Sequence, residues 1–110
     1  MACFYLQSRA QGKAQEDSYY RAVYLMQRTL SEFVNVTATK FGIDPSKIAR
    51  TVRINQKGLQ ILMDDEAIRE LPEGQDMKVE FAMTDMQQPK WHTRPPNMEM
   101  HTAYELRLVY

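Results

Sequence analysis

The sequence predicts an α+β domain in which one main helix lies across one face of a mixed β-sheet. Several segments rich in aromatic and β-branched residues alternate between two faces, as strands do. One longer segment places its apolar residues at helical spacing. Glycine, asparagine, aspartate and proline separate these segments. At 110 residues, the chain is long enough for one hydrophobic core.

The first two predicted strands form an antiparallel pair. Residues 2–7 place Phe4 and Leu6 on one side of an extended chain and Cys3 and Tyr5 on the other. Residues 8–18 are polar and lack apolar periodicity, which predicts a loop. Residues 19–25 return to strand composition, so we expect them to run back along the first strand.

The main helix is predicted from Thr29 to Gly42. Thr29 and Glu32 have the spacing of a capping box, and Gly42 is a residue that ends helices. Between them, the apolar residues that recur at helical spacing are Leu30, Phe33, Val34, Ala38 and Phe41.

The second half predicts a hairpin, a helical turn and a fifth strand. Residues 51–54 and 59–63 are apolar-rich and flank a turn at 55–58. Asp64 or Asp65 is expected to cap a short helical turn, which Pro72 ends. The last segment of this half alternates, and its inward residues are predicted to be Met77, Val79, Phe81 and Met83.

The order of these elements is that of the ubiquitin-like β-grasp fold. We therefore predict a domain at residues 1–84, a Pro-bearing linker at 85–103 and an extra C-terminal strand at 104–110. The apolar face of that strand would be exposed if it stayed free, so we expect it to dock on a sheet edge. Its residues on this face are Tyr104, Leu106, Leu108 and Tyr110.

The composition argues against several classes of function. The chain has 14 basic and 14 acidic side chains, whereas a domain that binds DNA backbone is normally basic. Cys3 is the single cysteine, so neither an internal disulfide nor a multi-cysteine zinc site is possible. No apolar run approaches the roughly 20 residues that cross a bilayer.

The sequence also lacks a recognisable catalytic arrangement. His92 and His101 fall in the predicted linker, where no neighbouring residue is expected to orient them. The acidic run from Asp64 to Glu66 is interpreted as a helix cap and not as a metal site. We expect no enzyme activity, no cofactor, no metal and no small-molecule substrate.

The second strand carries the clearest candidate for a binding surface. Tyr20, Ala22 and Tyr24 lie on the face opposite Val23 and Leu25. Tyrosine is enriched at protein interfaces because its ring buries area while its hydroxyl tolerates water. This face contacts a second molecule or is covered by the C-terminal strand. The dimer-interface hypothesis therefore comprises Tyr20, Ala22, Tyr24, Tyr104, Leu106, Leu108 and Tyr110.

Three segments resemble the C-terminal domain of Grainyhead-like (CP-two-type) transcription factors, most closely the fungal branch. They are YYRAVYLMQRTLSEF, KFGIDPSKI and INQKGLQILMDDEAIRELPEGQDM, and the resemblance is best over residues 19–83. It implies a ubiquitin-like fold, homodimerisation and a nuclear location. It also implies that DNA is read by a separate upstream domain outside this chain.

One alternative class shares the predicted fold. A Ras-association or Phox-and-Bem-type interaction module would use the separation of charge along the chain, with basic residues at 40–57 and acidic residues at 64–76. Salt-sensitive association would favour this module over an apolar dimer.

Overall fold

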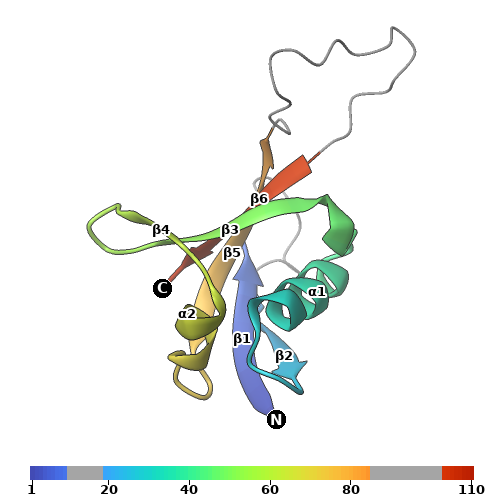
Figure 1. Cartoon of the computed structure of the whole chain (residues 1–110), viewed down its shortest axis with the longest axis vertical. Coiled ribbons are helices and arrows are strands. Elements are labelled where there is room, and N and C mark those ends of the chain that lie inside the picture. Colours follow the sequence, from blue (N-terminus) through green and yellow to red (C-terminus); the bar gives the residue numbers. More distant parts are fainter. Residues whose placement is uncertain (10–18, 85–102) are drawn as a thin grey trace, which may run out of the picture.

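The computed structural model describes residues 1–9, 19–84 and 103–110, which form an α+β domain with a six-stranded mixed sheet (Figure 1). The strand order is β2-β1-β5-β6-β3-β4, and α1 and α2 lie on the same face of the sheet. We call this the helix face and the opposite one the open face. The elements are β1 (Ala2–Ser8), β2 (Arg21–Leu25), α1 (Leu30–Lys40), the 3₁₀ turn η2 (Pro45–Lys47), β3 (Ile48–Ile54), β4 (Gln60–Leu62), α2 (Asp65–Arg69), β5 (Asp76–Thr84) and β6 (Ala103–Val109).

The first hairpin forms as predicted. β1 and β2 are antiparallel, and Phe4 lies opposite Val23 in the register. Both side chains are buried on the helix face, where the ring of Phe4 meets Phe33 of α1 edge-on at a centroid distance of 6.3 Å. The alternation of apolar residues therefore identified the inward side of both strands correctly.

The main helix also agrees with its sequence signals, with one difference at the cap. The Thr29 hydroxyl accepts the N–H of Glu32 at 3.1 Å, and Gly42 follows the helix with a φ of 77°. The Glu32 carboxylate accepts the N–H of Gln27 instead of that of Thr29. A further free N–H of the first turn, that of Leu30, is bound at 2.8 Å by Asp65 of α2.

The second hairpin and the short helix are confirmed. β3 and β4 are antiparallel, although β3 begins at Ile48, earlier than predicted. Asp64 caps α2 by accepting the N–H of Ala67 at 2.8 Å. The two neighbouring aspartates therefore cap different helices, because Asp65 reaches α1. This shared use of one acidic pair holds α2 beside the start of α1.

The position of β6 corrects the predicted docking on a sheet edge. β6 pairs with a sheet neighbour as expected, but it lies in the interior, antiparallel to β5 and parallel to β3. An interior strand satisfies its backbone groups on both sides, which an edge position does not. β6 begins at Ala103, and residues 85–102 of the predicted linker, with His92 and His101, lie outside the described residues.

One residue predicted to face inward is exposed. Met77 and Val79 of β5 are buried, and Phe81 is half-buried against Phe41 with ring centroids 6.0 Å apart. Met83 is 76% exposed, although it follows the same alternation. The end of β5 extends beyond the part of the sheet that the helices cover (Figure 1). The side chains of β5 therefore alternate regularly to its end, but the helices do not cover the end of the strand.

Because Leu108 is fully buried in the interior strand, Leu108→Ala is expected to destabilise the domain by about 2–5 kcal/mol, the usual cost of a cavity in a core. Urea denaturation followed by circular dichroism measures this loss. The control is Met83→Ala, for which we expect a change within about 0.5 kcal/mol because that side chain is exposed. Equal effects of the two substitutions would contradict the burial of Leu108 in the core.

Candidate protein-binding surface

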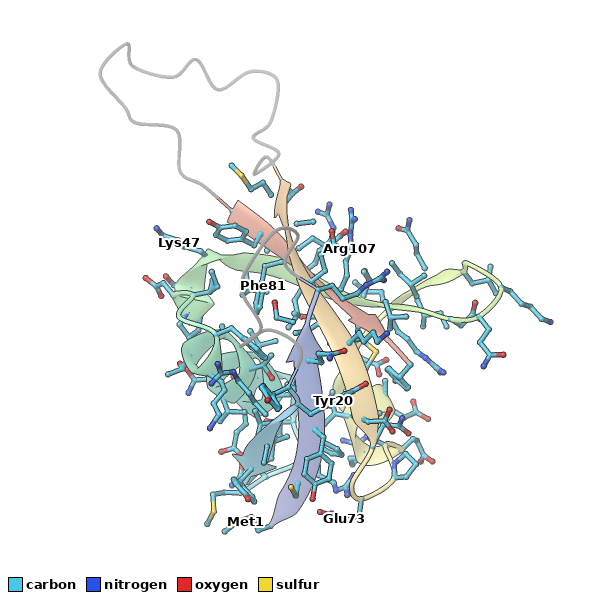
Figure 2. All side chains as sticks on the ribbon, turned by 180° about the vertical axis from the view of Figure 1, so that it is seen from behind. Met1, Tyr20, Lys47, Glu73, Phe81 and Arg107 are labelled. Carbon is cyan, nitrogen blue, oxygen red and sulfur yellow. The ribbon has the colours of Figure 1, made fainter. Side chains whose placement is uncertain are left out.

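The open face of the sheet carries an exposed group of tyrosines over its first two strands (Figure 2). Tyr5, Tyr20 and Tyr24 are 44%, 44% and 57% exposed. The register places Tyr24 opposite Cys3 and Tyr5 opposite Ala22, so these side chains share one face. We call Cys3, Tyr5, Tyr20, Ala22 and Tyr24 the tyrosine surface.

The dimer-interface hypothesis included three members of this surface and left out Cys3 and Tyr5. The missed signal was present in the alternation of the first strand, where Phe4 and Leu6 point inward and Tyr5 therefore points outward. What the sequence lacked was the register, which brings Tyr5 beside Ala22.

The tyrosine surface contains no aspartate, glutamate, lysine or arginine. Hydrogen bonding with the side chain of Cys3 is the main cause that raises the pKa of Tyr5 above its ordinary value of 10.0. The Tyr5 phenol therefore stays protonated and neutral. Neutral tyrosine rings beside Ala22 can exclude water on contact while their hydroxyls still find hydrogen-bond partners.

The predicted residues of β6 do not join this surface. Leu106 and Leu108 are fully buried on the helix face, so no partner can reach them in the folded domain. Tyr104 is half-buried. Tyr110 is also half-buried, and the Arg53 guanidinium lies 3.9 Å from its ring centroid. The hypothetical interface therefore divides between two faces of the sheet.

The structure also decides between the two interpretations of the second strand. β6 lies within the sheet and is separated from β2 by β5 and β1. It does not cover Tyr20 or Tyr24, both of which are exposed among the described residues. The prediction that the C-terminal strand covers this face is wrong, and the interpretation as a contact surface stays open.

A charged network crosses the centre of the open face. The Glu105 side chain of β6 is almost fully buried and accepts hydrogen bonds from Arg50 of β3 and Arg107 of β6, both at 2.6 Å. Arg107 also lies 3.9 Å from Glu80 of β5, and Arg50 donates to the hydroxyl of Thr84 at 3.2 Å. We call these five side chains the Glu105 network.

The network links three strands. Hydrogen bonds from Arg107 and then from Arg50 hold the pKa of Glu105 below its usual value of 4.5. A carboxylate with a lowered pKa is a poor proton donor or acceptor near neutral pH. Its two arginine partners instead tie β6 to β3, and Arg107 extends the tie to β5.

Two further kinds of feature were sought in the described residues, a cluster of metal ligands and a membrane-spanning helix. Within residues 1–9, 19–84 and 103–110, no three histidine, cysteine, aspartate or glutamate side chains are grouped to hold a metal. No helix in the described part of the chain is long and apolar enough to span a membrane.

The chain belongs to the GRHL1-like C-terminal domain family, whose model matches residues 11–93. The resemblance to Grainyhead-like proteins is thereby confirmed. β1 ends before the matched range and β6 begins after it, although both strands pair with β5 in the sheet. No curated protein and no solved structure matches the chain.

The lowered pKa of Glu105 predicts a pH-dependent contribution to stability. A carboxyl group whose pKa is lower in the folded state stabilises the fold above its unfolded pKa, and this contribution is lost as the pH falls through the folded pKa. Glu105→Gln is expected to cost about 1–2 kcal/mol at neutral pH. The difference from the unsubstituted chain should shrink as the pH falls below 4.5.

Urea denaturation at a series of pH values measures this difference. Asp76→Asn is the matched control, because Asp76 is an exposed carboxylate on β5 outside the Glu105 network. If the effect of Glu105→Gln stays constant from neutral to strongly acidic pH, the stabilisation does not depend on an ionised Glu105 carboxylate.

Proposed function

We propose that this chain is the homodimerisation domain of a Grainyhead-like transcription factor and that the tyrosine surface is its self-contact. The exposed tyrosines on the open face carry the proposal, and the family membership supports it. The factor would act in the nucleus, as transcription factors of this family are expected to do.

The chemistry of the surface suits contact between two identical copies. In a two-fold dimer, the same residues approach each other across the axis. Like charges near that axis would repel, but the five residues of the tyrosine surface are neutral. Tyr19 and Met26, which lie just outside residues 20–25 in the sequence, are also exposed. Methionine and tyrosine are both enriched at interfaces.

We also propose that the domain is a variant of the ubiquitin-like β-grasp fold. The order of elements along the chain supports this, as do the central parallel pairing of β1 with β5 and the packing of α1 across the sheet (Figure 1). The additional strand is β6, which separates β5 from β3.

The domain would neither catalyse a reaction nor bind DNA by itself. Its formal net charge of zero supports the second statement, because phosphate binding requires an excess of basic side chains. DNA would be read by another domain of the same factor. The family match does not favour the alternative of a Ras-association or Phox-and-Bem-type module.

Sedimentation equilibrium at micromolar concentration is expected to show a dimer. Tyr24→Arg should weaken it by about tenfold or more, because a charge would enter the centre of the contact on both copies. Tyr24 is exposed in the single chain, so we expect its unfolding free energy to change by less than about 0.5 kcal/mol.

Leu62→Arg is the matched control for this experiment. Leu62 is 68% exposed and belongs to β4, at the opposite edge of the sheet from β2. We expect this variant to dimerise like the original chain. A monomer at every concentration would refute the homodimer. Loss of the dimer in Leu62→Arg alone would place the contact at the β4 edge of the sheet and refute the tyrosine surface as the self-contact.

Gel-shift titration with duplex DNA tests the second part of the proposal. At moderate salt, we expect no sequence-specific complex at submicromolar concentrations of the chain, because it lacks the net positive charge that releases counterions from DNA. A chain that also contains the upstream domain serves as the positive control. A specific submicromolar complex with this chain alone would overturn the expectation.

A further inference from the structure

A groove of about 830 Å³ runs between the first half of α1 and the first half of β3. Its walls include Leu30 and Val34 of α1 and the consecutive residues 48–51 of β3. It is bounded by a helix, so it belongs to the helix side of the sheet, away from the tyrosine surface. The proposed dimer contact would leave it open.

The groove exposes the edge of a strand. Successive side chains of a strand point to opposite faces, so four consecutive residues can line one groove only if the strand presents its backbone edge. β4 pairs only with residues 52–54 of β3. The carbonyl of Thr51 also accepts a hydrogen bond on this side, from the N–H of Met63 at 2.9 Å. In the described sheet, residues 48–50 of β3 therefore have a strand neighbour on the β6 side alone.

The register irregularity in β3 lies at this edge. The pairing with β6 passes from Ile48 to Arg50, so Ala49 has no opposite residue there. The extra residue of a bulge is left out of the ladder, and its backbone groups need other partners. Ala49 is exposed and lines the groove. A strand added from the groove side would supply those partners.

The side chains that line the groove favour particular residues in a bound segment. Leu30, Val34 and Ile48 are half-buried and present apolar contacts. The carboxylates of Glu32 and Asp65 line the same groove, and neither forms an ion pair with a basic residue in the described part of the chain. A lysine or arginine of a bound segment would neutralise them.

We propose that this groove binds an extended peptide segment of another protein, which adds a strand to residues 48–50 of β3. The segment has apolar side chains at alternate positions, which contact Leu30, Val34 and Ile48, and a basic side chain that reaches Glu32 and Asp65. Main-chain hydrogen bonds provide affinity in this mode of recognition, and the side-chain contacts provide specificity. The domain thereby recruits a second protein independently of dimerisation.

Selection from a phage-displayed library of random eight-residue peptides tests the proposal, with the full chain as bait. Enriched peptides are expected to alternate apolar residues and to carry lysine or arginine. The most enriched peptide is then synthesised with a fluorophore and titrated by fluorescence anisotropy. Its binding should perturb the backbone amide NMR signals of residues 48–50 while those of Tyr20 and Tyr24 stay unchanged.

Three variants and one control variant locate the peptide. Ala49→Trp and Ser31→Trp each place a large ring at an exposed position of the groove and should weaken binding about tenfold or more. Gln60→Trp is the control, an exposed strand residue outside the groove, and should leave binding unchanged. Asp65→Asn keeps an oxygen for the N–H of Leu30 but removes the charge. It should weaken binding about threefold to tenfold and reduce its salt dependence.

Thermal melting followed by circular dichroism confirms that each variant is folded. Failure to enrich any peptide would overturn the proposal, as would peptides that lack basic residues or bind both tryptophan variants unchanged. Weaker self-association of Ala49→Trp in sedimentation would also overturn it, since the occupant would then be a second copy of the chain. If the chain is monomeric but still binds the peptide in the groove, the proposed dimer is refuted and the proposed peptide binding is supported.

Discussion

The backbone hydrogen bonds of β6 hold the sheet together, because β5 and β3 do not pair with each other in the described structure. β6 lies between them and pairs with both, from Lys78 to Thr84 on one side and, with one irregularity at Ala49, from Ile48 to Ile54 on the other. Without it, two interior strand edges would lose their partners, and unpaired buried backbone groups are costly. The hairpin of β3 and β4 joins the rest of the sheet only through this strand.

The position of β6 also determines what its side chains do. Leu106 and Leu108 face the helices and complete the core. Glu105 and Arg107 face the open side, where the neighbouring strands supply Arg50 and Glu80 as partners. The carboxylate of Glu105 is almost fully buried on that side, so its two arginine partners are needed to offset its desolvation. The same strand therefore contributes apolar packing to one face and the ion pairs of the Glu105 network to the other.

The two faces of the domain are suited to different contacts. The open face presents neutral tyrosines at the β2 end of the sheet, far in strand order from the β3 and β4 hairpin. The helix side presents a groove with an unpaired strand edge and two carboxylates. Self-association on the first and peptide binding on the second would not compete for the same residues. A transcription factor could in this way be dimeric and still recruit another protein through one small domain.

Local patterns in the sequence determined most of the secondary structure. The alternation of Val23 with Tyr24 identified the two faces of β2, and Thr29 and Gly42 marked the ends of α1, because strand periodicity and helix caps depend only on nearby residues. The same reasoning found the acidic pair that caps α2, but not that Asp65 also binds the start of α1. That second role depends on how the two helices pack.

Only the tertiary structure decided which strands are neighbours. Alternation shows that Leu106 and Leu108 share a face, yet it does not say whether their strand lies at an edge or in the interior, since both positions bury the same face. One of the two arginine partners of Glu105 is Arg50, 55 residues away in the chain, and no local pattern pairs them. The sequence therefore determined the elements and their inward sides, whereas the long-range backbone pairing of β6 decided the sheet order, the Glu105 network and which tyrosines remain exposed.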